Sequence, residues 1–193
     1  MTPRFELSGS APSDCPLLIA SWEDAVTDPQ SVLAARAPGH DVWIERVLAI
    51  NAPKTKEWVS LLWPSEAPRT VLYGMGKKSK AKVYKLRLAI RSLTKAIGQR
   101  KYDTIAIAAG SFLCAGLTLP QVVRLLQTEI ALAAYDYTEL KRIDPEDPPV
   151  VTLDRVIFVT GQAADPALQE QVERGNAVAG GLTWTRNLAN RPA

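Results

Sequence analysis

Thr70-Val71-Leu72-Tyr73-Gly74-Met75-Gly76 is the stretch that decides the fold, together with the residues that follow it. Its first four residues are typical of a buried strand, and the two glycines predict a tight turn. From Lys77 to Ile97, apolar residues recur at spacings of three and four, which predicts a long helix with one apolar face. The residues of this face are Val83, Leu86, Ile90, Leu93 and Ile97. Gly98 stands where a helix C-cap is expected, and residues 104–108 predict the next strand.

The same alternation continues on both sides of this stretch. Further strands are predicted at residues 5–7, 17–20, 58–63 and 156–159. Further helices are predicted from Asp28–Pro29, from Leu119–Pro120 to Tyr135, and from Asp165–Pro166 to Ala189. Strands that alternate with helices predict an α/β sheet with helices on both faces.

Composition favours an ordinary globular protein. The chain has 193 residues, of which 47% are hydrophobic, and its net charge is +3, which argues against disorder. No apolar run approaches the ~20 residues that a membrane span needs, and the N-terminus lacks the apolar core of a signal peptide. Cys15 and Cys114 lie far apart in apolar surroundings, so we expect buried free thiols and a cytoplasmic protein.

Residues suited to catalysis or metal binding are scarce, and none is assigned a catalytic or metal-binding role. His40 is the single histidine and follows a Pro-Gly turn, so we expect a solvated loop residue. Asp144, Glu146 and Asp147 cluster in one loop, but interleaved prolines favour a solvated connection over a cation site. Four tryptophans are expected in the core or at an interface rather than in a stacking platform: Trp22, Trp43, Trp58 and Trp63.

The most informative charged feature is a basic run, since residues 67–102 contain no acidic residue. The candidate contacts for an anion or a nucleic acid are Lys77, Lys78, Lys80, Lys82, Lys85, Arg87, Arg91 and Lys95. The last three follow one another at spacings of four, which destabilises a helix unless nearby acids or a polyanionic partner offset the charge. A solvated lysine face remains the alternative. Similarly, the Gly74–Gly76 turn could bind an anion or could simply require a positive φ.

Three stretches of the chain together resemble the leucyl aminopeptidase (cytosol aminopeptidase) family. They are Val71-Leu72-Tyr73-Gly74-Met75-Gly76-Lys77, Glu129-Ile130-Ala131-Leu132-Ala133-Ala134-Tyr135-Asp136-Tyr137 followed by Lys141, and Thr185-Arg186-Asn187-Leu188-Ala189-Asn190-Arg191-Pro192-Ala193. The resemblance covers residues 70–193 through the order and spacing of these motifs, whereas residues 1–69 fit only in strand pattern and length.

The resemblance implies an N-terminal domain that is similar to macro domains. Residues 1–163 would form this domain, with a mixed sheet flanked by helices on both faces, and residues 164–193 would be a linker helix to a catalytic peptidase domain. In this family the catalytic domain binds two divalent metals, Mn or Zn, through Asp, Glu and Lys side chains and also carries an Asn-Thr-Asp-Ala-Glu-Gly-Arg motif, and the subunits form hexamers. That motif is absent here, so no metal ligand or catalytic residue is transferred to this chain.

Three functions therefore stay open. The first is a non-catalytic domain of an aminopeptidase, in which Asn187 and Asn190 could brace the linker helix. Because some relatives in this family bind DNA, the second is a binding module that uses the basic helix 77–101 for nucleic acid or a macro-like cleft for a nucleotide. The third is a structural module that serves the geometry of a hexamer.

Overall fold

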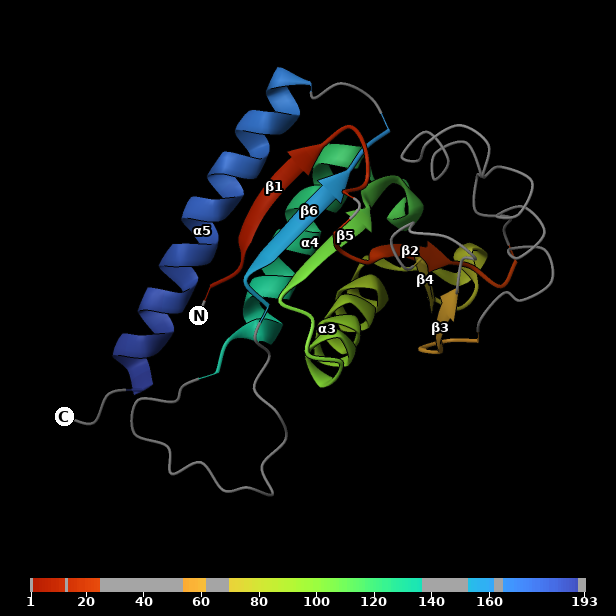
Figure 1. Cartoon of the computed structure of the whole chain (residues 1–193), viewed down its shortest axis with the longest axis horizontal. Helices are drawn as coiled ribbons and strands as arrows, with labels where there is room; N and C mark the ends of the chain where they lie inside the picture. The colour runs from red at the N-terminus through yellow and green to blue at the C-terminus, as the bar shows by residue number, and fades with distance from the viewer. Residues whose placement is uncertain are drawn as a thin grey trace.

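A six-stranded mixed sheet forms the centre of the chain (Figure 1). The computed structural model describes residues 2–12, 14–24, 54–61, 70–136, 153–161 and 165–190. The strands are β1 (Arg4–Ser8), β2 (Leu17–Ser21), β3 (Trp58–Leu61), β4 (Thr70–Gly74), β5 (Thr104–Ala108) and β6 (Arg155–Val159). They lie in the order β1-β6-β5-β2-β4-β3, and only β3 runs antiparallel to its neighbour. The predicted α/β fold with a mixed sheet is confirmed.

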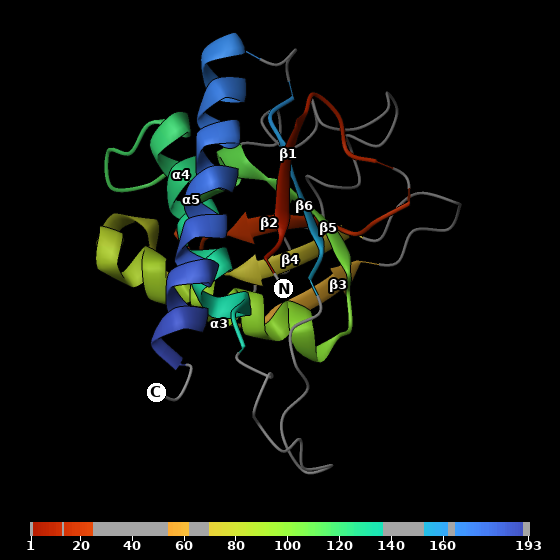
Figure 2. The ribbon, with the colours of Figure 1, turned by 90° about the vertical axis from the view of Figure 1, so that its left-hand side faces the viewer.

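The three helices among the described residues pack on one face of this sheet (Figure 2), so the expectation of helices on its other face stays a prediction. The three helices are α3 (Val83–Gln99), α4 (Leu119–Ala134) and α5 (Pro166–Asn190), and two short 3-10 turns, η1 (Lys78–Lys80) and η2 (Ala109–Phe112), precede α3 and α4. Because neighbouring residues of a strand point to opposite faces, Leu18 faces these helices whereas Leu17 belongs to a second buried cluster on the other face. The helix predicted from Asp28–Pro29 falls outside the described residues.

The beginning of α3 differs from the sequence prediction. The helix was expected from Lys77, but it begins at Val83, because Lys82 is extended (φ −130°, ψ 149°) and η1 occupies residues 78–80. The carboxylate of Asp24, from the turn after β2, accepts hydrogen bonds from the backbone N–H groups of Lys78 and Ser79 and from the Ser79 hydroxyl. This distant contact stabilises η1 as a separate turn. As the first residue of α3, Val83 is 41% exposed rather than part of the apolar face.

The end of α3 also differs. Gly98 is a buried helical residue, the C-cap is Arg100, and the left-handed conformation beyond the cap is adopted by Lys101 (φ 55°). The prediction that Gly98 caps the helix is therefore wrong. A helix commonly ends with a left-handed residue whose N–H bonds a carbonyl of the last turn, and here Lys101 donates to the carbonyl of Gly98 at 2.9 Å.

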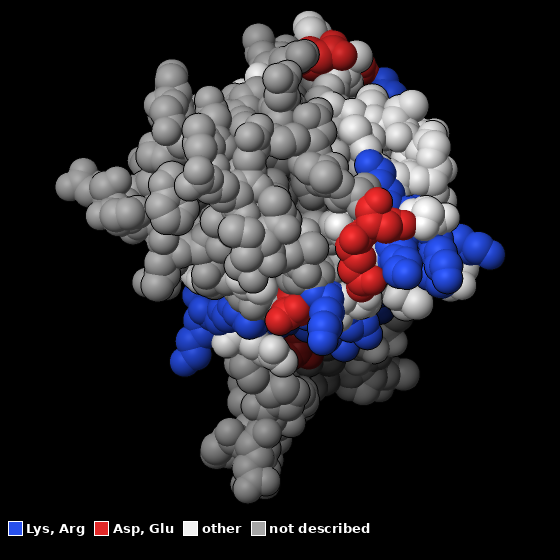
Figure 3. Space-filling view, turned by 90° about the vertical axis from the view of Figure 1, so that its right-hand side faces the viewer, with Lys and Arg blue, Asp and Glu red and all other residues white. Residues whose placement is uncertain are grey.

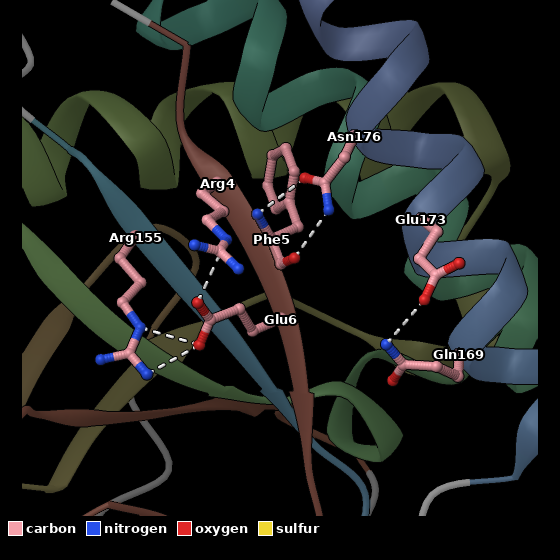
Figure 4. Close-up of polar contacts among 7 residues, drawn as sticks. All are labelled: Arg4, Phe5, Glu6, Arg155, Gln169, Glu173 and Asn176. Atoms are coloured by element: carbon pink, nitrogen blue, oxygen red, sulfur yellow. Dashed lines mark hydrogen bonds and ion pairs between the residues drawn. The ribbon is translucent and has the colours of Figure 1, made fainter.

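Helix α5 lies along the edge of the sheet beside β1 and contacts both β1 and α4 (Figures 1 and 2). Leu168, Val172, Gly175 and Ala179 are its buried residues. The side-chain amide of Asn176 bonds the main chain of β1, accepting from the N–H of Phe5 and donating to its carbonyl, both at 2.8 Å (Figure 4). The helix predicted from Asp165–Pro166 to Ala189 thus buries side chains against the α/β domain over its first half.

Candidate functional site

A pocket of about 300 Å³ opens where β2 and β4 end. Trp22 and Glu23 line it from the turn after β2, and Met75 and Gly76 line it from the turn after β4. The opposite wall belongs to η1 and the first turns of α3, where the lining residues include Lys80, Ala81, Lys85, Leu86 and Ala89. In open α/β sheets, ligands bind outside the carboxyl ends of parallel strands, which is the position of this pocket.

Main-chain contacts join the two turns under the pocket. Met75 N–H donates to the Ser21 carbonyl at 2.8 Å, and Glu23 N–H donates to the Gly76 carbonyl at 2.9 Å. Gly76 has φ +81°, and a Cβ atom there would lie 2.8 Å from the Thr55 hydroxyl oxygen. The expected tight turn with a positive φ is confirmed at Gly76, where a side chain would meet both backbone strain and a close neighbour.

The floor of the pocket is apolar and is fixed by Trp22. The Trp22 side chain is 4% exposed, and its indole N–H donates to the carbonyl of Ser111 in η2 at 2.9 Å. The prediction that Trp22 is a core residue is confirmed. Of the other tryptophans considered, Trp43 and Trp63 lie outside the described residues, and Trp58 lies on β3.

The turn after β4 has fewer backbone N–H groups available to bind an external anion than its sequence suggested. The backbone N–H groups of Lys78 and Ser79 already donate to Asp24. The Ser79 hydroxyl makes the largest contribution to lowering the pKa of Asp24 below its ordinary value, and the two N–H groups add to it. Any anion at this site would therefore depend on lysine side chains.

The candidate cations of the basic run fall into two groups. Lys77, Lys78, Lys80, Lys82 and Lys85 are exposed, and none of them forms an ion pair with another described residue. Arg87 and Arg91 instead bond the two carboxylate oxygens of Glu129 from α4, each at 2.5 Å. Glu129 is completely buried, so it is the nearby acid that offsets the closely spaced charges on α3. Glu129 lies in the second of the three family-like stretches, but its sequence neighbours do not indicate this ion pair.

Figure 3 shows that the charged side chains do not form one continuous basic surface on the face that it presents. Lys and Arg gather in separate groups, with Asp and Glu between them. Lys95 lies apart from the lysines of the pocket and lines a second, more open hollow with Arg91, Tyr135 and Arg186.

The end of α5 is braced against the end of α4. The Tyr135 hydroxyl donates to Asn187 Oδ1 at 3.0 Å and accepts from Asn190 Nδ2 at 3.1 Å. The Arg186 guanidinium lies 4.8 Å from the centre of the Tyr135 ring and donates to the Leu132 carbonyl. The structure therefore shows Asn187 and Asn190 bracing the end of α5.

Metal ligands do not converge in the described part of the chain, where no three His, Cys, Asp or Glu side chains lie close enough to hold an ion. The described residues therefore do not fit the metal pair that the resemblance implies, and we assign no catalytic step to them. His40 and the 144–147 loop fall outside the described residues. Cys15 and Cys114 are buried free thiols, as expected, and burial raises the pKa of both. Across the described residues, no helix combines the length and apolar character needed to cross a membrane.

Comparison with known families decides the relationship. A sequence model described as "Cytosol aminopeptidase family, N-terminal domain" matches residues 43–144. The chain belongs to this family. A curated relative, the probable cytosol aminopeptidase of Protochlamydia amoebophila (strain UWE25), is 29% identical over 122 residues. The match covers 63% of this chain and 23% of the relative, so this chain of the cytosol aminopeptidase family spans about a quarter of that relative's length.

Solved structures show the same fold at low sequence identity. A mutant of tomato leucine aminopeptidase superposes with a TM-score of 0.62 and 16% identity, covering 99% of this chain and 39% of that one. The bottromycin maturation enzyme BotP gives 0.55 at 20% identity, over 92% and 33% of the two chains. A Trypanosoma brucei macrodomain in complex with ADP gives 0.54 at 13% identity, over 89% and 67%. The macro-domain-like architecture expected for this cytosol aminopeptidase domain is confirmed.

Proposed function

We propose that this chain is the non-catalytic N-terminal domain of a metal-dependent leucyl aminopeptidase, and that it packs against the catalytic domain through the outer face of α5. The parent enzyme would release N-terminal residues from peptides. Two divalent metals, Mn or Zn, would activate water and polarise the scissile carbonyl in the catalytic domain. Membership of the cytosol aminopeptidase family supports this proposal, as does the much greater length of the matched relative.

The observation that carries the proposal is the apolar outer face of α5. Trp184 is 67% exposed and Leu188 is 47% exposed. At 3.6 residues per turn, Leu188 lies about 180° around the helix from the buried Ala179, so it points away from the α/β domain. A surface helix usually buries one face and exposes a polar one, whereas α5 carries apolar residues on both. A helix with two apolar faces is suited to lie between two partners.

The glycines of α5 support the same conclusion. Gly175 is explained by the α/β domain, because a Cβ atom there would lie about 2 Å from the Gln127 side chain. Gly180 and Gly181 have no atom within 4 Å of their Cβ positions, although glycine inside a helix costs about 1 kcal/mol relative to alanine. They leave open space one turn before Trp184, where a second domain can approach the helix backbone closely.

The direct test uses hydrogen exchange. In a subunit that contains both this chain and the catalytic domain, we expect the amides of residues 180–188 to exchange more slowly than in the isolated chain. Residues 168–175 are the internal control, because this segment already buries Leu168, Val172 and Gly175 against the α/β domain and should exchange alike in both proteins. Equal exchange at residues 180–188 would contradict the proposed interface.

A second test addresses the proposed lack of peptidase activity in this chain. We expect the purified 193-residue chain to show no hydrolysis of leucine amide with added Mn²⁺ or Zn²⁺. Robust activity that survives removal of contaminating peptidases would overturn the non-catalytic assignment. We further propose a hexameric parent and a cytoplasmic location. The similarity to a probable cytosol aminopeptidase supports the location.

A second candidate function is nucleic-acid binding through the basic segment 77–101, which comprises η1 and α3. The five exposed lysines without a described ion pair favour it, whereas the pairing of Arg87 and Arg91 with Glu129 reduces the free positive charge. Phosphate contacts weaken as salt rises, so a true interface would retain duplex DNA at ~50 mM salt and lose it at higher salt. Failure to bind at ~50 mM salt would reject this function.

A further inference from the structure

We infer that the pocket at the ends of β2 and β4 binds a compact organic phosphate, a phosphate group attached to an apolar or aromatic body. This inference goes beyond the proposed packing function, because the pocket and α5 lie on different parts of the domain. The pocket has about 300 Å³ of space, which is at the lower end of the range for small-molecule sites. A ligand the size of a mononucleotide matches that space.

The chemistry of the walls suits a ligand with two unlike ends. Trp22, Met75 and Leu86 provide apolar surface, and Trp22 is fixed by its hydrogen bond to Ser111. Lys77, Lys80 and Lys85 provide three ammonium groups at the rim. Ligand sites are typically apolar with a few polar groups that fix orientation, and lysine is a common phosphate-binding point charge.

The charge balance of the pocket favours an anion. Lys77, Lys80 and Lys85 form no ion pair with a described residue. The acid among the described lining residues is Glu23, whose carboxylate accepts a hydrogen bond from the Thr55 hydroxyl at 3.0 Å. Among the described lining residues, three positive charges stand against one negative charge, and a phosphate monoester carries up to two negative charges at neutral pH.

The position of the lysines in the fold gives them a common target. Lys77 follows the Gly76 turn, Lys80 ends η1, and Lys85 lies in the first turn of α3. These three segments differ in backbone conformation, yet all of them line one pocket. The hydrogen bonds to Asp24 hold η1 in place, and the positive φ of Gly76 sets the direction of the turn. Lysines that serve only to keep a surface solvated would not need to line the same cavity.

The test is calorimetry on the whole chain with three probes: AMP, inorganic phosphate and adenosine. AMP carries both a phosphate and an aromatic body, whereas each of the other probes carries one of them. We expect AMP to bind with a Kd below ~1 mM and about tenfold more tightly than either partial probe. Absence of AMP binding at ~50 mM salt, or equal affinity for AMP and adenosine, would overturn the inference.

Three variants locate the binding. Lys80→Gln combined with Lys85→Gln should weaken AMP binding by about tenfold or more. Lys95→Gln is the matched control, since Lys95 is an exposed lysine of α3 outside this pocket, and it should leave the affinity unchanged. Ala89→Leu narrows the apolar wall, so it should weaken AMP binding while leaving phosphate binding in place.

The outcomes separate a pocket from a general basic surface. Equal losses in the Lys95→Gln and Lys80→Gln/Lys85→Gln proteins would assign the effect to overall charge and overturn the pocket. Duplex DNA binding that depends on Lys80 and Lys85, without AMP binding, would assign these lysines to a nucleic-acid surface instead. Circular dichroism of each variant checks that the domain is folded.

Discussion

The side-chain amide of Asn176 makes both main-chain hydrogen bonds to Phe5 that a neighbouring strand would make. Its Oδ1 accepts from the Phe5 N–H and its Nδ2 donates to the Phe5 carbonyl, each at 2.8 Å (Figure 4). β1 is an edge strand, and an edge strand exposes unpaired main-chain groups that can recruit another chain. One residue of α5 therefore both attaches the helix to the sheet and protects the middle of its edge.

Asn176→Ala should lower the free energy of unfolding by about 1 to 2 kcal/mol, because two hydrogen bonds to a partly buried main chain are lost. Urea denaturation measures this change. Gln169→Ala is the control: it removes an exposed hydrogen bond to Glu173 on the same helix and should change stability by less than about 0.5 kcal/mol. Equal effects of the two substitutions would mean that the Phe5 contact contributes little.

Gly175→Ala should destabilise the domain by about 2 kcal/mol, which is typical of overpacking. Its Cβ atom would lie 2.2 Å from Cδ of Gln127, whose Nε2 donates to the Val172 carbonyl at 2.9 Å. The clash would therefore disturb a buried contact between α4 and α5. Removing the obstructing side chain in the double variant Gly175→Ala/Gln127→Ala should recover part of the loss, which a double-mutant cycle measures.

Gly181→Ala is the matched comparison and should have the opposite effect on stability. Nothing lies within 4 Å of its Cβ position, so alanine should stabilise the isolated chain by about 0.5 to 1 kcal/mol through helix propensity. Thermal denaturation of both variants makes the comparison. Destabilisation by Gly181→Ala in the isolated chain would show that the outer face of α5 is not open.

Glu129→Gln should destabilise the domain by about 2 kcal/mol, because it removes the charge that compensates Arg87 and Arg91. The two arginines are partly exposed, so solvent limits the loss to less than that of a fully buried pair. Glu170→Gln removes the exposed pair with Arg174 and should have an effect below about 0.5 kcal/mol. A similar loss in both variants would argue against the structural role of Glu129.

The elements that sequence reasoning predicted are those set by local pattern. β4, β5 and α4 follow from runs and spacings within a few residues, and α4 and α5 begin at the proline signals that mark them. The three quoted motifs also predicted the family that the comparison identifies. Apolar periodicity and proline or glycine signals predict these elements because each depends only on residues that are close in the sequence.

The parts that escaped prediction depend on residues far apart in sequence. Asp24 bonds Lys78 across 54 positions and thereby separates η1 from α3. Glu129 pairs with Arg87 across 42 positions, and Asn176 bonds Phe5 across 171. Spacing within one element predicts which face is apolar, but it does not say which distant acid or amide will meet that face.

Asp24 gives the turn beside the pocket a dependence on pH. The Ser79 hydroxyl, followed by the N–H groups of Lys78 and Ser79, lowers the pKa of Asp24 below its ordinary value of 3.8. A carboxyl whose pKa is lower in the folded state stabilises that state above the unfolded pKa, and this stabilisation is lost as pH falls through the folded pKa. We therefore expect the Asp24 carboxyl, followed by NMR, to titrate below 3.8.

Ser79→Ala removes the largest cause of the shift and should move the Asp24 pKa up towards its ordinary value, whereas Thr128→Ala, at an exposed hydroxyl of α4, should not. Because η1 carries Lys80, release of the turn should also weaken AMP binding in the Asp24→Ala protein at neutral pH. The same loss should develop in the unsubstituted chain as its Asp24 becomes protonated. Titration of Asp24 at or above 3.8 would show that its hydrogen bonds to η1 do not form in solution.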